Sequence, residues 1–232
     1  MKQVFLLITT LATLTVQAQK ILIGYNFSAG YSFRNIKNSD GSTSNGFTVN
    51  SRNDIEVAKF GYSTGLNFCL NVSKYIAFET GIQYSNKGYQ TKKQDLIYFP
   101  PNPSAPVKAK FSYAYQYLGI PLKAKFFFGK SNLRFVAGIG FTTSVLLNIK
   151  NSTAYEYAGG NTEKKTQSST SGFNKVDLSP MISAGIDYKL SHKMHVFAEP
   201  EFRYGLINTK DATITEKLWS AGLNVGFYYV VK

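Results

Sequence analysis

The sequence predicts an all-β protein, an eight-stranded antiparallel transmembrane up-and-down β-barrel. Three observations predict it: a cleavable leader, an alternation of apolar and small polar residues with a period of two, and connections that alternate between short and long. Successive side chains of a strand face opposite ways, so this alternation gives each strand one apolar and one polar face. Transmembrane barrels have such strands, with lipid outside and a polar lumen inside.

The first residues have the features of a secretory signal peptide. Lys2 supplies the positive start, and residues 4–16 are apolar but too few to cross a bilayer. Val16-Gln17-Ala18 has the small-residue pattern of a cleavage site. We therefore expect residues 1–18 to be a signal peptide and residues 19–232 to form one outer-membrane barrel domain.

The first predicted strand shows the alternation most clearly. A secreted soluble β protein would also alternate, with its apolar face as the core, and it remains the alternative. Here, however, the polar face is rich in Gly, Ser and Asn, and the apolar face carries aromatic residues at its ends, as in strands that face lipid. The apolar face holds Ile21, Ile23, Tyr25, Phe27, Ala29, Tyr31 and Phe33, and the polar face holds Gly24, Asn26, Ser28, Gly30 and Ser32.

Seven further strands follow, and their connections predict the orientation in the membrane. The turns near Ser73, Lys130 and His192 are short, whereas residues 34–58, 87–110, 149–175 and 207–216 form long or polar connections. Outer-membrane barrels place short turns in the periplasm and long loops outside. We therefore expect a location in the outer membrane of a Gram-negative bacterium with both termini periplasmic. The further predicted strands are residues 59–72, 76–84, 111–128, 133–147, 176–190, 194–206 and 218–231.

The predicted strand over residues 111–128 departs from the alternation. Its tyrosines, Tyr113, Tyr115 and Tyr117, occupy odd positions, whereas its apolar residues from Leu118 onward occupy even positions. One interpretation is a β-bulge at Tyr117–Leu118, near Pro121, which cannot donate a ladder hydrogen bond. The other is that the tyrosines belong to an extracellular extension of the strand.

Three stretches resemble the PorT-like outer-membrane β-barrel proteins. Residues 117–128, YLGIPLKAKFFF, look like the signature strand of that family, and residues 78–88, FETGIQYSNKG, are similar to its third strand. Tyr204-Gly205-Leu206 matches its seventh strand, whereas Gly119 stands where an acidic residue is expected. The resemblance covers essentially the whole mature chain and implies an eight-stranded barrel. The family's named member takes part in assembling a protein-secretion system, but these strand motifs describe fold and do not carry that function over.

Charged residues fall on the lumen face of the predicted strands. Side chains just fill the interior of an eight-stranded barrel, and buried charges need partners. We therefore expect a plug of ion pairs that ties the strands together, with an ion or solute pathway as the alternative. The predicted lumen residues are Glu79, Lys123, Lys125, Arg134, Asp187, Glu199, Glu201 and Arg203, of which Glu199, Glu201 and Arg203 are expected to pair with Lys123, Lys125 or Arg134.

The second long connection combines positive charge with aromatic and proline residues. The formal net charge is +13, and lysines cluster around this connection with only Asp95 opposing them. We expect outer-membrane lipid, surface glycolipid and envelope proteins as partners, because exposed positive charge attracts phosphates and carboxylates. No nucleic-acid partner is expected, because a secreted barrel is not in the compartment that holds the genome. The alternative to an interacting loop is a solvated loop without a specific ligand. The predicted loop interaction residues are Lys92, Lys93, Tyr98, Phe99, Lys108 and Lys110.

The sequence offers little for catalysis. Its two histidines, His192 and His195, lie at a predicted periplasmic turn, and no metal-ligand cluster, phosphate-binding loop or nucleophile motif is recognisable. We predict a barrel without cofactor that is not an enzyme and acts as a structural protein or an interaction platform through its extracellular loops, alone or within a larger envelope or secretion assembly. A narrow porin-like or transport-associated channel is the first alternative, and a lipid A-modifying enzyme is a remote one.

Overall fold

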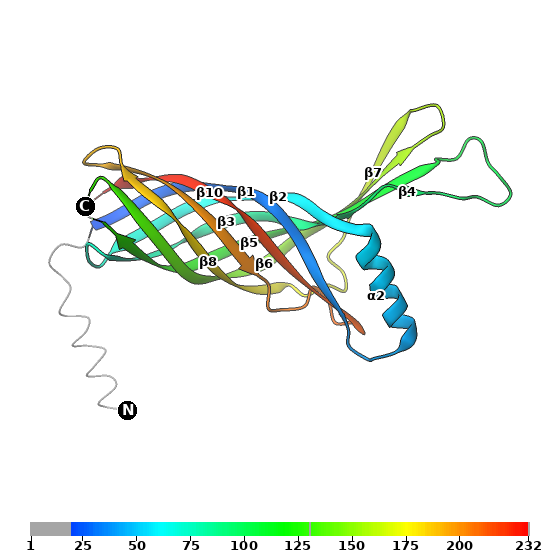
Figure 1. Cartoon of the computed structure of the whole chain (residues 1–232), viewed down its shortest axis with the longest axis horizontal. Coiled ribbons are helices and arrows are strands. Elements are labelled where there is room, and N and C mark those ends of the chain that lie inside the picture. The colour runs from blue at the N-terminus through cyan, green and yellow to red at the C-terminus, as the bar shows by residue number, and fades with distance from the viewer. Residues whose placement is uncertain (1–19, 130, 232) are drawn as a thin grey trace.

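The computed structural model describes residues 20–129 and 131–231, most of which lie in long antiparallel strands (Figure 1). The predicted signal peptide, residues 1–18, lies outside the described residues. The elements are β1 (Lys20–Asn38), α2 (Thr43–Ile55), β2 (Glu56–Asn71), β3 (Ile76–Thr91), β4 (Gln94–Asp95), β5 (Lys108–Phe128), β6 (Leu133–Glu156), β7 (Thr162–Ser168), β8 (Val176–Lys189), β9 (Met194–Tyr204) and β10 (Ile214–Val230).

The strands form one antiparallel sheet that closes on itself. The ring runs β1, β2, β3, β5, β6, β8, β9, β10, and β10 returns to β1 over the register Leu22↔Val230 to Asn38↔Ile214. The prediction of an all-β antiparallel barrel is confirmed. The described residues form ten strands rather than the expected eight, because β4 and β7 extend the sheet outside the ring.

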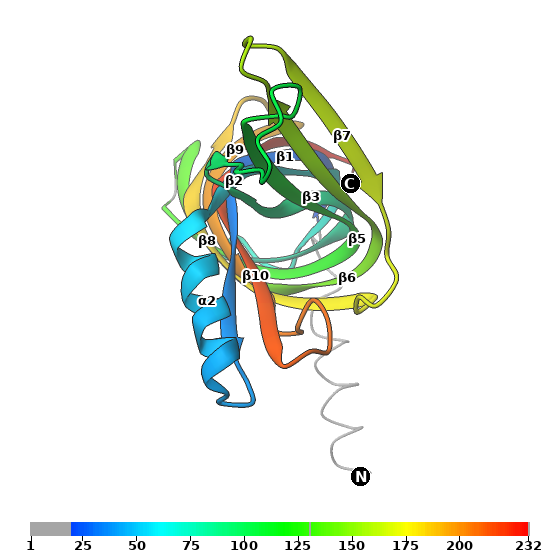
Figure 2. The ribbon, with the colours of Figure 1, turned by 90° about the vertical axis from the view of Figure 1, so that its right-hand side faces the viewer.

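The two ends of the barrel differ. The short turns and the described C-terminal end lie together at one end, whereas α2, β4 and β7 lie at the other (Figure 1). Figure 2, seen from that second end, shows the ring with α2 on one side and β7 on the other. We call the first end the turn end and the second the loop end.

The alternation in sequence becomes an inside and an outside. On β1, Tyr25 is 43% exposed and its neighbour Asn26 is 1% exposed, and the same contrast recurs on the other ring strands. The outside of the ring is therefore a continuous band of Ile, Leu, Val, Phe and Tyr, far larger than the apolar patches of water-soluble proteins. Such a band suits contact with lipid. No helix among the described residues is long and apolar enough to cross a membrane.

The irregularity that the sequence analysis assigned to strand 111–128 lies in the neighbouring strand. On β5, Tyr115, Tyr117 and the odd positions that follow all face the lumen, so this strand does not change phase. Between β5 and β6 the register shifts at Gln116/Tyr117, where Leu147 of β6 has no partner. The bulge is therefore in β6, and the bulge predicted at Tyr117–Leu118 was wrong because the tyrosines were taken as lipid-facing. The outer part of β5 does continue into an extension beyond the ring.

The helix α2 was not predicted, since residues 34–58 were expected to be a loop. Its start is marked by Ser42, whose side chain accepts a hydrogen bond from the Asn45 backbone N–H at 3.3 Å. None of its residues is buried, so the helix has no apolar stripe. Without that stripe the sequence lacks the periodicity by which helices are recognised.

The assignment of faces predicts a large difference between lipid-facing and lumen-facing substitutions. Ile139 is 58% exposed at the middle of the outward face of β6. Its replacement by Arg should lower the free energy of unfolding by about 2–4 kcal/mol. Asn224→Ser on the lumen face removes one side-chain hydrogen bond, with Asn26, and should cost about 0.5–1.5 kcal/mol. Urea titration of the protein folded in lipid vesicles measures both values, and equal costs would contradict the register.

Candidate functional site

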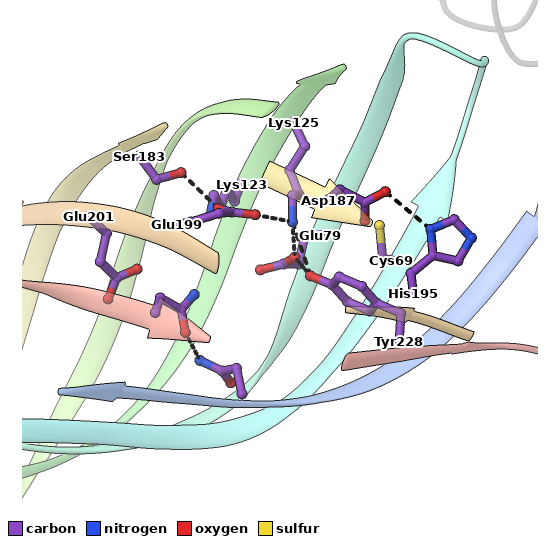
Figure 3. A network of polar contacts seen from close by, with 12 residues as sticks. Cys69, Glu79, Lys123, Lys125, Ser183, Asp187, His195, Glu199, Glu201 and Tyr228 are labelled. Carbon is purple, nitrogen blue, oxygen red and sulfur yellow. Dashed lines mark hydrogen bonds and ion pairs between the residues drawn. The ribbon is translucent and has the colours of Figure 1, made fainter. Parts of the chain in front are cut away.

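Buried ion pairs cross the lumen near the turn end (Figure 3). Glu199 on β9 is 0% exposed and lies between two lysines of β5. Its Oε1 lies 2.5 Å from Lys125 Nζ, and its Oε2 accepts hydrogen bonds from Lys123 Nζ and from Ser183 Oγ, the latter at 3.0 Å. One carboxylate thus links β9, β5 and β8.

The same cluster continues to the opposite wall. Lys125, also 0% exposed, lies 3.4 Å from Glu79 Oε2 and donates to Tyr228 Oη at 3.2 Å. Tyr228 on β10 in turn donates to Glu79 on β3. Two positive and two negative groups therefore balance one another, as charges removed from water require. We call Glu79, Lys123, Lys125, Glu199 and Tyr228 the lumen network.

Arg134 and Asp187 form a second pair, closer to the turn end. Arg134 and Asp187 are register partners on β6 and β8, and Arg134 Nη2 donates to Asp187 Oδ1 at 2.7 Å. The same Oδ1 lies 3.1 Å from His195 Nδ1. The expectation that Arg134 would pair with Glu199 or Glu201 was therefore wrong, because its nearest carboxylate is the residue directly opposite on the next strand.

Glu201 and Arg203 lie nearer the loop end and pair with each other. Arg203 Nη2 lies 3.0 Å from Glu201 Oε1, and Arg203 Nη1 donates to Gln83 Oε1 at 2.5 Å. Their predicted pairing with Lys123, Lys125 or Arg134 was wrong. Side chains two residues apart share one face of β9 and meet directly, whereas Lys123 and Lys125 are already held by Glu199.

A small polar cavity of about 40 Å³ lies at this level of the lumen. Its walls are mostly Ser side chains and Gly backbone of β1, β2, β3, β6, β8 and β10, joined by Lys87, Glu201 and Arg203. Two buried polar atoms at its edge, Thr142 Oγ1 and Arg203 Nε, have no hydrogen-bond partner within the protein. The space suits about two or three water molecules that would satisfy such atoms.

Apolar layers fill the lumen on both sides of the lumen network and the polar cavity. The layer at the turn end consists of Leu22, Cys69, Ala77, Phe127, Val136, Phe197 and Tyr228, and the layer toward the loop end consists of Tyr89, Tyr115, Tyr117, Leu146, Ile149 and Leu218. The interior is therefore a packed core with a polar middle.

A third charged group holds α2 against the loop end of the ring. Glu216 on β10 accepts hydrogen bonds from Arg52 at 2.8 Å, Tyr89 at 3.1 Å and Tyr115 at 3.0 Å. Arg52, on the last turn of α2, also pairs with Glu56 at 2.7 Å. We call Arg34, Arg52, Glu56, Tyr89, Tyr115 and Glu216 the rim cluster, in which Arg34 pairs with Glu56 at 2.5 Å.

The rim cluster was not predicted from the sequence. Arg34, Glu56 and Glu216 were assigned to loops, because they lie at the borders of the predicted strands. The signal was present: Arg34 continues the inward phase of Ser32 on β1, and Glu216 continues that of Leu218 on β10. Extending the alternation by a few residues would have placed both on the lumen face.

The predicted loop residues lie on a sheet that projects from the ring. Lys108 and Lys110 are on β5, which pairs here with β4 and β6, and Lys92 and Lys93 precede β4. Lys93 pairs with Glu156 at 2.5 Å, and this hydrogen bond and positive charge lower the pKa of the Glu156 carboxyl below its ordinary value. We call β4, β7 and the outer parts of β5 and β6 the outer sheet.

The two predicted aromatic residues, Tyr98 and Phe99, lie at the tip of this sheet. Tyr98 is 39% exposed and Phe99 is 100% exposed. Within the described residues, no group of three or more His, Cys, Asp or Glu could hold a metal ion. The loop end can therefore bind a partner through its lysines and its exposed apolar side chains. In the lumen, the charged side chains neutralise one another.

Comparisons with known proteins concern the barrel. A family model described as outer membrane protein beta-barrel domain matches residues 17–211. The comparison with curated proteins gives no match. OprG from Pseudomonas aeruginosa is 12% identical, with 91% of this chain and 95% of that chain covered and a TM-score of 0.45. Neisserial surface protein A is 13% identical, with 90% and 99% covered and a TM-score of 0.40.

Proposed function

Because this chain belongs to the outer membrane protein β-barrel domain family, we propose that it is an integral outer-membrane protein that acts as an interaction platform through its extracellular loops. In this proposal the eight ring strands span the membrane, the turn end and both termini face the periplasm, and the outer sheet and α2 lie outside the cell. The protein is not an enzyme, carries no cofactor and binds no nucleic acid. Its partners are surface glycolipid and envelope proteins.

The contrast between the lumen and the loop end carries this proposal. Packed apolar layers and neutralised charges occupy the interior, with room left for about two or three waters. The outer sheet, in contrast, presents lysines and bare apolar side chains on a rigid scaffold, the arrangement in which loops commonly bind partners. We further propose that the protein is PorT-like in the sense of its strand motifs, with a role in a larger envelope assembly.

Shortening the second loop tests the platform. Replacing residues 92–108 by a short Gly/Ser turn should leave the ring intact, because the ring pairs of β3 and β5 lie outside this segment. Association with anionic material of the cell surface should fall, since the deletion removes Lys92, Lys93 and Lys108 together with the apolar tip. Heat-modifiable migration on gels reports folding, and crosslinking with pull-down from native membranes reports association.

The matched control shortens residues 157–161, the turn between β6 and β7, which carries no lysine. This control variant should fold and should associate as the parent protein does. A second-loop deletion that leaves every envelope interaction unchanged, or one that prevents barrel folding, would contradict the proposal.

A narrow channel is the second candidate, and the polar cavity is the observation that favours it. Serine hydroxyls, Lys87, Glu201 and Arg203 surround a space that can hold water. Transport would require movement of the apolar layers on both sides of that space. Steady single-channel conductance of the protein in planar bilayers would support the channel and contradict the interaction platform. Absence of conductance would support the platform.

A further inference from the structure

The end of the second loop is an apolar tip that no other part of the described chain covers. Ile97 is 94% exposed and Phe99 is 100% exposed, more than any other large apolar side chain among the described residues. Tyr98 lies between them and is 39% exposed. In Figure 1 this loop, beyond β4, reaches the point of the described chain farthest from the turn end. The tip therefore lies well outside the lipid-facing band of the ring.

Local structure keeps these side chains apart from the rest of the protein. The loop is closed at its base, where the Leu96 backbone N–H donates to Val107 O at 2.8 Å, and a turn follows at Asn102, whose O accepts from Ala105 N at 3.1 Å. Pro100, Pro101 and Pro103 fix φ between these points and limit folding back. The tip thus presents a preformed, convex apolar surface.

The outer sheet beneath the tip is positively charged. Its three carboxylates are each paired with a lysine: Asp95 with Lys108 at 3.8 Å, Glu156 with Lys93 at 2.5 Å and Glu163 with Lys165 at 3.3 Å. Three more lysines, Lys110, Lys150 and Lys164, form no ion pair among the described residues. Lysines therefore outnumber carboxylates on the outer sheet, which has a net positive charge. Because exposed ion pairs are weak in water, the paired lysines can also exchange their carboxylates for other anions.

We propose that this tip inserts into the interface of a second, anionic lipid bilayer apposed to the cell surface, with the lysines of the outer sheet binding its headgroups. Aromatic and aliphatic side chains on a rigid tip, combined with lysines behind it, are the features by which peripheral segments bind anionic membranes. A convex tip suits a fluid interface, whereas a protein partner would need a pocket shaped to receive it. The inference rests on the proposed platform function and specifies its partner.

The test uses the full chain in nanodiscs of neutral phosphatidylcholine. These nanodiscs are mixed with large vesicles of either phosphatidylcholine alone or equal parts phosphatidylcholine and phosphatidylglycerol, and vesicle-bound protein is measured by flotation. The parent protein should bind the anionic vesicles and not the neutral ones, and added salt should weaken binding. The double variant Ile97→Ser, Phe99→Ser should bind roughly tenfold less or weaker still, because it loses two apolar anchors.

Phe47→Ser is the matched control. Phe47 is 72% exposed on α2, away from the outer sheet, and its replacement should leave binding unchanged. A second readout places an indole at the tip: the fluorescence of Phe99→Trp should shift to shorter wavelength with anionic vesicles. Native Trp219, on β10, supplies a constant background.

Several results would overturn the inference. These are equal binding of the tip variant and the parent, equal binding to neutral and anionic vesicles, or no spectral shift at position 99. If any of them occurs while the second-loop deletion still reduces envelope association, the lipid partner is wrong and a protein or soluble polyanion takes its place on the platform. If the deletion changes no association at all, the platform function itself fails.

Discussion

Replacing Glu199 by Gln should lower the free energy of unfolding by about 3–5 kcal/mol. The substitution keeps the shape and the hydrogen bond with Ser183 but removes the negative charge between Lys123 and Lys125. Lys125 would retain Glu79 at 3.4 Å, whereas Lys123 forms no other ion pair among the described residues. The large cost arises because a charge buried away from water is left without its partner.

Urea unfolding of the protein in lipid vesicles, followed through Trp219 fluorescence, measures this cost. The matched control is Glu163→Gln on β7, which removes an exposed carboxylate 3.3 Å from Lys165 and should change the unfolding free energy by less than about 1 kcal/mol. The double variant Lys123→Met, Glu199→Leu should recover part of the loss, since it removes both charges. A loss below about 1 kcal/mol for Glu199→Gln would contradict the lumen network as a structural unit.

The ring strands were predictable because a period of two is a strong signal when one face meets lipid and the other a narrow lumen. On β1 it holds from Ile23 to Phe33 without interruption, and the structure keeps that phase. The parts outside the ring were not predictable in this way. The helix α2 buries none of its residues, and β7 is exposed along its whole length, so neither carries a periodic apolar pattern.

Individual contacts between lumen side chains could not all be predicted from the sequence. Alternation placed Arg134 and Arg203 on the inner face, but which residues meet depends on strand stagger and on height along the barrel axis. Arg134 meets Asp187 because the register of β6 and β8 puts them opposite each other. Arg203 meets Glu201 and Gln83 because β9 and β3 supply them at its own level. The contacts of Arg134 with Asp187 and of Arg203 with Gln83 cannot be read from the alternation of single strands. The contact of Arg203 with Glu201 can, because residues two apart on β9 share a face.

The rim cluster leads to a second prediction: Glu216→Ala should free α2 while leaving the ring folded. Glu216 accepts hydrogen bonds from Arg52, Tyr89 and Tyr115, and Arg52 is the side chain of α2 that reaches the wall of β10. Hydrogen bonds to charged groups contribute about 1.5–3 kcal/mol each. Losing the one from Arg52 should therefore raise the opening equilibrium of α2 by roughly tenfold to a hundredfold, since about 1.4 kcal/mol corresponds to a factor of ten.

Hydrogen exchange measured by mass spectrometry tests this at the level of single segments, because local opening sets the exchange rate of backbone amides. Peptides from residues 43–55 should exchange faster by that factor, whereas peptides from the membrane-spanning parts of β1 and β10 should keep their protection. Lys217→Ala, at the next position of β10 and on its other face, should change neither. Unchanged exchange of α2 in Glu216→Ala would show that Arg34, which donates to Asn53 of α2 at 2.6 Å and pairs with Glu56, holds the helix without Glu216. Faster exchange of the ring strands would instead make the rim cluster part of barrel stability. The contacts favour local release, because the ladder between β1 and β10 extends without interruption from Leu22 to Asn38 past the level of Glu216.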